Sequence, residues 1–62
     1  MYKLKIDVVE KNGLTSTYDS TSRFENLEEA AEAATVTRNA LFDDYSNYAI
    51  LDYSVDIVPA ND

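Results

Sequence analysis

Two segments of this chain alternate apolar and polar residues, and an alanine-rich segment lies between them. The apolar positions are Tyr2, Leu4, Ile6 and Val8 in residues 2–10, and Ala49, Leu51, Tyr53, Val55 and Ile57 in residues 48–58. Successive side chains of a β-strand point to opposite faces, so a period of two predicts a strand with one buried face. The intervening segment must therefore help to cover the apolar faces of two strands.

A turn signal follows the first alternating segment. Residues 11–13 read Lys-Asn-Gly, and residues 14–22 are rich in Thr, Ser and Tyr, which predicts a β-hairpin. A two-residue Asn-Gly loop would set the polar side of the second strand beside the apolar side of the first. A three-residue loop with Gly13 in the left-handed conformation pairs Ile6 with Tyr18 instead. We expect the three-residue loop, with the weakly apolar second strand at a sheet edge.

Residues 27–44 favour a helix. Asn26 is a good N-cap, Glu29 completes a capping box, and five alanines follow. The predicted apolar stripe consists of Leu27, Ala30, Ala34, Thr37, Leu41 and Tyr45, with Ala31 and Phe42 on its flank. The opposite face carries Glu29, Glu32, Val36, Asn39 and Asp43. The helix ends near Asp44 without a glycine, and acids at this end oppose the helix dipole.

The order of these elements predicts the α+β fold class. We expect one small β-β-α-β domain over residues 1–62, with residues 59–62 as a frayed tail after Pro59. A right-handed crossover makes the third strand parallel to the second, and the strongly apolar first strand belongs between them. The prediction is a three-stranded antiparallel sheet of order 2-1-3 with one helix packed on one face.

The other face of this sheet has no predicted cover. Alternation assigns to it Lys3, Lys5, Asp7, Val9, Thr15, Thr17, Asp19, Thr21, Tyr48, Ile50, Asp52, Ser54 and Asp56. Most of these side chains are polar, so the face can contact water as many antiparallel sheets do. We expect Tyr48, Ile50 and Val9 to form a small apolar patch on it.

The residue types argue against an enzyme. Cysteine and histidine are absent, and the chain contains no phosphate-binding loop, dinucleotide fingerprint or nucleophile elbow. Neighbouring carboxylates occur at residues 28–29 and 43–44, but acid–base catalysis needs one of them in an apolar cleft, for which so small a fold has little room. Asp43, Asp44 and Ser46 lack the ligand spacing of a calcium loop. We expect no catalytic residue, metal or cofactor.

The charge restricts the partners. Twelve acids and five bases give a net charge of −7, which disfavours direct binding to nucleic acid or to anionic membranes. No apolar stretch approaches the roughly 20 residues of a membrane span, and the alternating start of the chain does not resemble a signal peptide. We therefore expect a cytoplasmic protein.

Two functions fit these restrictions. The first is a non-enzymatic module that binds a protein, with its acidity steering it to a basic, nucleic-acid-binding surface. Its candidate contact residues are Glu28, Glu29, Glu32, Val36 and Asp43 on the helix, and Asp7, Asp19, Asp52, Asp56, Tyr48 and Ile50 on the open sheet face. The second is a self-associating structural protein that forms a homodimer through a strand edge or the open sheet face. Acidity that serves solubility alone is the simpler interpretation of the charge.

Arg38 falls on the apolar stripe of the predicted helix. We expect its stem to pack on apolar surface and its guanidinium to pair with an acid such as Asp44 or Asp7. The alternative is an anchor at a partner interface, where arginine is enriched.

In size, charge and hairpin-then-helix order, the chain resembles acidic phage-encoded inhibitors of host polymerases, restriction systems and CRISPR nucleases. The resemblance implies a phage or mobile-element inhibitor that occupies a basic groove. It rests on no shared motif and assigns no site residue.

Overall fold

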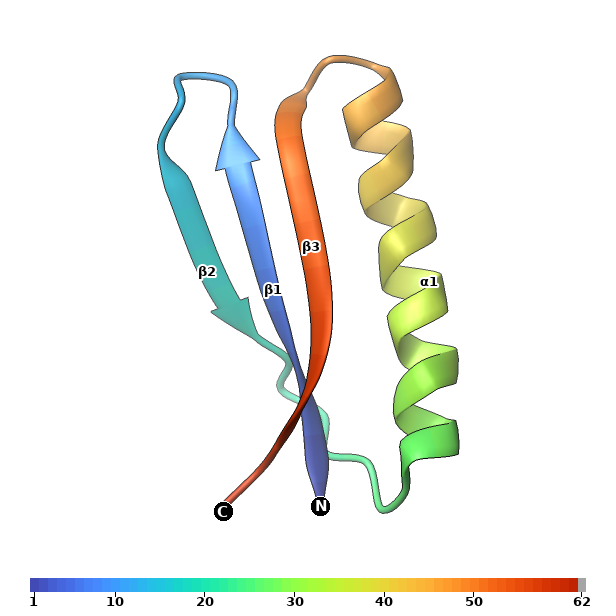
Figure 1. Cartoon of the computed structure of the whole chain (residues 1–62). Helices are drawn as coiled ribbons and strands as arrows, with labels where there is room; N and C mark the ends of the chain where they lie inside the picture. Colours follow the sequence, from blue (N-terminus) through green and yellow to red (C-terminus); the bar gives the residue numbers. More distant parts are fainter. Residues whose placement is uncertain (62) are drawn as a thin grey trace.

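The computed structural model describes residues 1–61. Asp62, the last residue of the predicted tail, lies outside the described residues. Three strands and one helix follow one another as β1 (Tyr2–Glu10), β2 (Thr15–Asp19), α1 (Leu27–Ser46) and β3 (Ile50–Pro59) (Figure 1). The predicted α+β class and β-β-α-β order are confirmed. Within residues 1–61, no helix is both long and apolar enough to cross a membrane.

The sheet has the predicted order β2-β1-β3, and both of its strand pairs are antiparallel. Ile6 lies opposite Tyr18 and Val8 opposite Ser16, as the three-residue loop requires. Gly13 closes that loop with a φ of +88°. The two-residue loop would place the polar side chains of β2 beside the buried apolar face of β1. The burial of that β1 face therefore selects the observed register.

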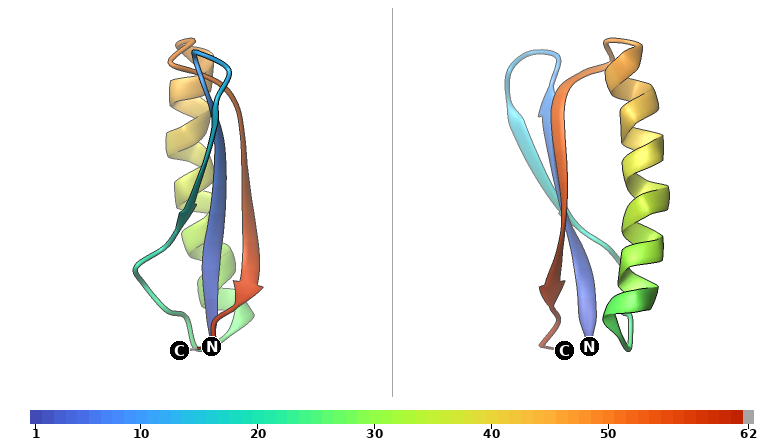
Figure 2. Two further views of the ribbon diagram at one scale, coloured as in Figure 1. Left: turned by 90° about the vertical axis from the view of Figure 1, so that its left-hand side faces the viewer. Right: turned by 45° about the vertical axis from the view of Figure 1, so that its right-hand side comes forward.

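Helix α1 packs on one face of the sheet, so the molecule has two layers (Figure 2). The centre of the core joins three elements through Leu4, Ala34 and Val55, and Leu4 is 2% exposed. Ala30 and Ala34 are completely buried, because alanines on the inner stripe let the helix backbone approach the strands closely. The predicted stripe is thus confirmed along the middle of α1.

The helix does not lie over the centre of the sheet. It runs alongside β3 and leaves β2 without cover (Figures 1 and 2). Tyr18 of β2 points to the helix side of the sheet but remains exposed. The short second strand therefore contributes little to the core, as its composition predicts.

The first turn of α1 has the predicted cap. The Asn26 side chain accepts a hydrogen bond from the Glu29 backbone N–H at 2.9 Å, which satisfies one of the free donors of that turn. At the other end the helix continues to Ser46, two residues beyond the predicted boundary at residue 44.

A β-bulge at the start of β3 overturns one prediction. Val9 lies opposite Asp52 and Glu10 opposite Ile50, so Leu51 is an extra residue on β3. Ile50 is consequently turned to the helix side and is 8% exposed, whereas Leu51 is 52% exposed. Alternation had assigned these two side chains to the opposite faces, and the predicted patch of Tyr48, Ile50 and Val9 does not form.

The end of β3 is also better ordered than predicted. Pro59 lies opposite Tyr2, and the Ala60 backbone N–H donates to the Met1 carbonyl at 2.9 Å. Pro59 can end a strand at an edge because its missing donor is not needed there. The prediction of a frayed tail is wrong for residues 59 and 60.

Arg38 contacts the outer edge of β3 and not a carboxylate. The backbone groups of Tyr2 and Leu4 bond on the β2 side of β1, so the backbone groups of Val55 point away from the sheet by the alternation of an antiparallel ladder. The Arg38 guanidinium Nη2 donates to the Val55 carbonyl at 2.8 Å. The predicted pairing with Asp44 or Asp7 is wrong, because the outward Val55 carbonyl has no strand partner and lies within bonding distance of the guanidinium.

Candidate functional site: the acidic helix face and the tyrosine pocket

The outer face of α1 is acidic and exposed along its length. It is formed by Glu28, Glu29, Glu32, Val36, Asn39 and Asp43, and we call it the acidic helix face. Glu28 and Asp43 lie about 22 Å apart along the helix axis, at 1.5 Å per residue. All six side chains are exposed, and the five other than Glu28 are those that the helical period places opposite the apolar stripe.

Among the described residues, no basic side chain pairs with a carboxylate of α1. The helix contains five acids and one base, which gives a net charge of −4, and its base, Arg38, bonds the Val55 carbonyl. Within residues 1–61, the ion pair of the molecule joins Lys3 Nζ to Asp19 Oδ2 at 3.1 Å, on the open sheet face. The negative potential of the acidic helix face is therefore not neutralised by its own chain.

The open sheet face, in contrast, satisfies its own polar groups. Asp7 on the central strand accepts a hydrogen bond from Thr17 Oγ1 of β2 at 2.7 Å and one from Ser54 Oγ of β3 at 3.4 Å. Lys5 lies between Asp19 and Asp56 in the register. Acids and bases thus alternate across this face, and its central carboxylate bonds both neighbouring strands.

The remaining sheet candidate also bonds within the chain. Asp52 Oδ1 accepts from the Tyr53 backbone N–H at 2.8 Å, a donor that points out from the free edge of β3. Of the candidates predicted on the open face, Asp7, Asp19, Asp52 and Asp56 lie in β-strands as expected, whereas Ile50 is buried on the helix side of the sheet.

The C-terminal end of α1 has an unusual residue in its cap. The Tyr48 backbone N–H donates to the Tyr45 carbonyl at 3.1 Å, and the Ala49 N–H donates to the Asp44 carbonyl at 2.9 Å. These two bonds define a Schellman motif, whose residue in the Tyr48 position is usually glycine. Tyr48 has a φ of +61°, a left-handed conformation that costs a bulky residue of the order of 1 kcal/mol.

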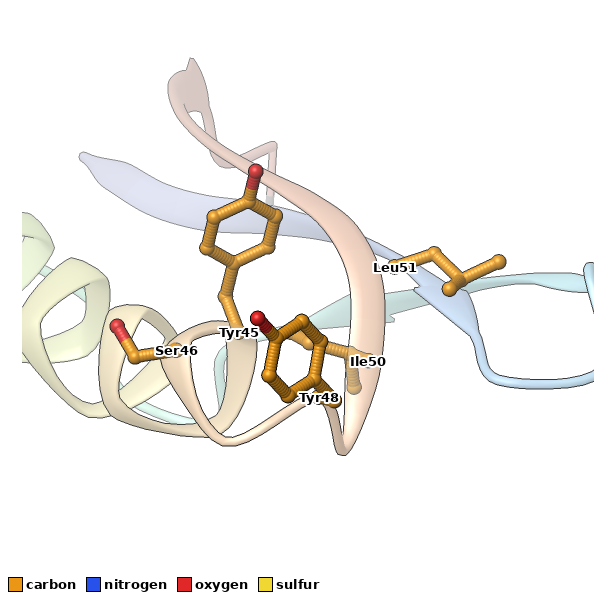
Figure 3. Close-up of a pocket in the computed structure, with 5 residues that line it drawn as sticks. All are labelled: Tyr45, Ser46, Tyr48, Ile50 and Leu51. Carbon is orange, nitrogen blue, oxygen red and sulfur yellow. The ribbon is translucent and has the colours of Figure 1, made fainter.

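A pocket opens beside this cap. It has a volume of about 320 Å³ and is lined by Tyr45, Ser46, Tyr48, Ile50 and Leu51. We call it the tyrosine pocket. Figure 3 shows the rings of Tyr45 and Tyr48 on the same side of the β3 ribbon, at the junction of α1 and β3. Tyr48 is 80% exposed, so its ring forms an outer wall of the pocket.

The two tyrosines are supported differently. The Tyr45 ring packs edge-on against Tyr53, with ring centroids 5.8 Å apart, and its centroid lies 6.4 Å from that of Phe42. Within residues 1–61, Tyr48 forms no such ring contact. Tyr45 is therefore held in place by its neighbours, whereas Tyr48 is placed mainly by its backbone.

Two of the residues that line this pocket, Tyr48 and Ile50, are among the predicted contact residues, but the sequence predicts neither the pocket nor the part of Tyr45, Ser46 and Leu51 in it. Tyr48 was predicted on the open sheet face, but it lies in the connection before β3. The pattern predicts Tyr45 and Leu51 in the core. The bulge in β3 places Leu51 at the surface, and Tyr45 is exposed because it lies in the last turn of α1. The available signal was a helix end without glycine, followed by an aromatic residue in the position that glycine normally takes.

The two surfaces of this site offer different chemical groups. Residues 1–61 contain no group of three His, Cys, Asp or Glu side chains placed to hold a metal ion. The tyrosine pocket offers two phenol rings, one serine hydroxyl and apolar carbon, and the acidic helix face offers carboxylates open to water.

Comparison with known proteins gives no relative: no family model, no curated protein and no solved structure matches this chain.

Proposed function

We propose that this chain is a non-enzymatic module that binds a basic protein surface through the acidic helix face. The observation that supports the proposal is the uneven pairing of its charges. The carboxylates of the open sheet face lie beside Lys3 and Lys5 or bond within the chain, while those of α1 are exposed and have no basic partner between residues 1 and 61.

Such a surface attracts a partner over a distance of about 10 Å at moderate ionic strength. Exposed carboxylates keep most of their hydration until contact, so the main effect of the acidic helix face is to raise the association rate and to select basic partners. A groove that binds nucleic acid has this basic character. We therefore propose an inhibitor of phage or mobile-element origin that occupies a nucleic-acid-binding groove in the cytoplasm of the host.

The test is capture of bacterial proteins on immobilised chain, followed by elution from about 0.05 M to about 0.5 M NaCl, over which electrostatic attraction is progressively screened. We expect retained proteins to bind nucleic acid and to be displaced by duplex DNA. Absence of retained protein at low salt, or retention that DNA does not reduce, contradicts the proposal.

Two triple variants of equal net charge locate the contact. Glu28→Gln, Glu29→Gln and Glu32→Gln neutralise one end of the acidic helix face, and glutamine at position 29 preserves the capping pattern. The matched control neutralises the open sheet face at Asp19→Asn, Asp52→Asn and Asp56→Asn. We expect the helix variant to lose the retained proteins and the sheet variant to keep them; the reverse result would place the contact on the open sheet face.

A second candidate function, self-association, is supported by the outer edge of β2. The backbone groups of Thr15, Thr17 and Asp19 point away from β1, and neither α1 nor a side chain such as Arg38 covers them. Sedimentation at increasing concentration tests it, because a monomer at every concentration excludes a homodimer as the functional form.

A further inference from the structure

From the tyrosine pocket we infer an arginine-binding site, in which the planar guanidinium of a basic partner inserts between Tyr45 and Tyr48. The inference rests on the proposed function, because it names the side chain by which the basic partner is held. Three independent features of this end of the molecule carry it: the aromatic walls, the helix terminus without a basic residue in its last turn, and the strained backbone of Tyr48.

The aromatic walls suit a cation. A guanidinium within about 6 Å of a tyrosine ring is attracted by the negative face of the ring, and it also stacks on that face. Tyr45 is fixed by its contact with Tyr53, while Tyr48 has a ring that is 80% exposed. A volume of about 320 Å³ is close to the lower limit for small-ligand sites and suits a single side chain.

The helix terminus supplies the complementary charge. The carbonyl end of a helix carries a partial negative charge, which proteins commonly balance with Lys or Arg in the last turn. The last turn of α1 contains no basic residue and contains Asp43 and Asp44 instead. Within residues 1–61, the Ser46 carbonyl accepts no backbone hydrogen bond from the cap, so it is free to accept one from a guanidinium N–H.

The backbone of Tyr48 indicates selection for the ring. Glycine would adopt a φ of +61° without strain, and the exposed Tyr48 ring makes few contacts that could repay the strain. Tyr48 is unfavourable for folding, and its ring faces solvent at the mouth of a pocket. Contact with a ligand would explain why a tyrosine occupies this position. A partner arginine is such a ligand, and the net charge of −7 favours its approach.

The direct test uses ¹⁵N-labelled chain and the probe N-acetyl-arginine amide, with N-acetyl-citrulline amide as the neutral control of the same shape. We expect saturable shifts of the Ser46, Tyr48 and Leu51 amides with the arginine probe. The citrulline probe should bind at least about fivefold more weakly, as expected for loss of a cation–π contact. Equal shifts with both probes overturn the inference, and so do shifts that appear on increasing the concentration of the chain alone.

Three variants identify the ring as the contact. Tyr48→Phe keeps the ring and should retain binding, whereas Tyr48→Leu should lose at least about fivefold in affinity for the arginine probe. Tyr18→Leu removes an exposed tyrosine from β2 and should change nothing. Retained affinity in Tyr48→Leu overturns the inference.

Tyr48→Gly separates binding from folding. We expect it to lose the arginine probe while its Tm rises by about 4–8 °C, because glycine relieves the left-handed strain. A fall in Tm would show that the ring stabilises the fold and would overturn the inference.

The two proposals fail separately. Basic proteins that bind wild type and Tyr48→Leu equally well disprove the arginine site alone, and arginine binding without any retained protein disproves the proposed function alone.

Discussion

Gly13 and Tyr48 are the residues between positions 1 and 61 that have a left-handed backbone, and they adopt it for different reasons. Gly13 closes the hairpin loop that sets the register of β2, and a Cβ built on it would meet no atom within 4 Å. Any effect of a substitution at Gly13 is therefore conformational. At Tyr48 the same conformation closes the helix cap, and the side chain there has a cost that glycine would avoid.

Gly13→Ala is expected to reduce the free energy of unfolding by about 1 kcal/mol, because alanine resists a φ of +88° although space is available. Urea unfolding followed by circular dichroism measures the change. Lys11→Ala is the control in the same turn and should alter stability by less than about 0.5 kcal/mol. Equal stabilities for Gly13→Ala and wild type would mean that the loop changes its conformation freely.

At the scale of elements, β3 and β2 are both edge strands but are protected differently. The outward Val55 carbonyl accepts from Arg38, and the outward Tyr53 N–H donates to Asp52 Oδ1. These contacts, together with the neighbouring helix, leave β3 a poor template for another strand. Strand β2 is short and polar. Its residue types limit pairing with another strand, whereas no neighbouring element covers its edge.

Arg38→Met should lower the free energy of unfolding by about 1 kcal/mol, since it keeps much of the apolar stem but leaves the Val55 carbonyl without its side-chain donor. We also expect more dimer in sedimentation, because the edge of β3 is then open to pairing. Asn39→Met, on the outer face of α1, is the matched control and should change neither quantity. An Arg38 variant as stable and monomeric as wild type would show that water replaces the guanidinium without loss.

The sequence predicts elements well where their pattern has a single solution. The faces of β1 determine the pairing of Ile6 with Tyr18, because the alternative register buries polar side chains. The cap at Asn26 follows from local chemistry in the same way. The strand order follows from which strand is apolar enough to lie in the centre of the sheet.

The candidate site was harder to predict, because it depends on departures from regularity. The extra residue Leu51 shifts Ile50 to the helix side, and a period-two pattern contains no signal for such an insertion. Tyr48 occupies a cap position that is usually glycine, so the sequence does not predict that its ring forms a pocket wall. The bond from Arg38 to a carbonyl shows that backbone acceptors at an edge compete with carboxylates.

At the scale of the whole molecule, the net charge of −7 opposes the small core. Helix α1 carries −4 of this charge, from five acids and one base, without an ion pair to a basic side chain within residues 1–61. Repulsion among like charges destabilises a compact state, and a domain of this size has little stability in reserve.

Added NaCl is expected to stabilise the protein. Raising the salt from about 0.01 M to about 0.5 M shortens the Debye length from about 30 Å to below about 8 Å, which screens the repulsion. A gain of about 1 kcal/mol corresponds to a rise in Tm of roughly 4–8 °C, which thermal circular dichroism measures. The triple variant Glu28→Gln, Glu29→Gln, Glu32→Gln should show a smaller rise. A Tm that is flat or falls with salt in the wild type would mean that repulsion does not limit its stability.

The core joins β1 to β3, so it can form only after both strands are present. Leu4 contacts a cluster that includes Val55, so the first strand is completed by nearly the last part of the chain. Contacts of such sequence separation form late, after the entropy of closing the intervening loop has been lost. During synthesis the hairpin can form early, but Leu4 remains in contact with water until β3 has left the ribosome. We therefore expect the sheet and its core to close in one step that waits for β3, and a chain cut before Val55 to leave Leu4 without its cover.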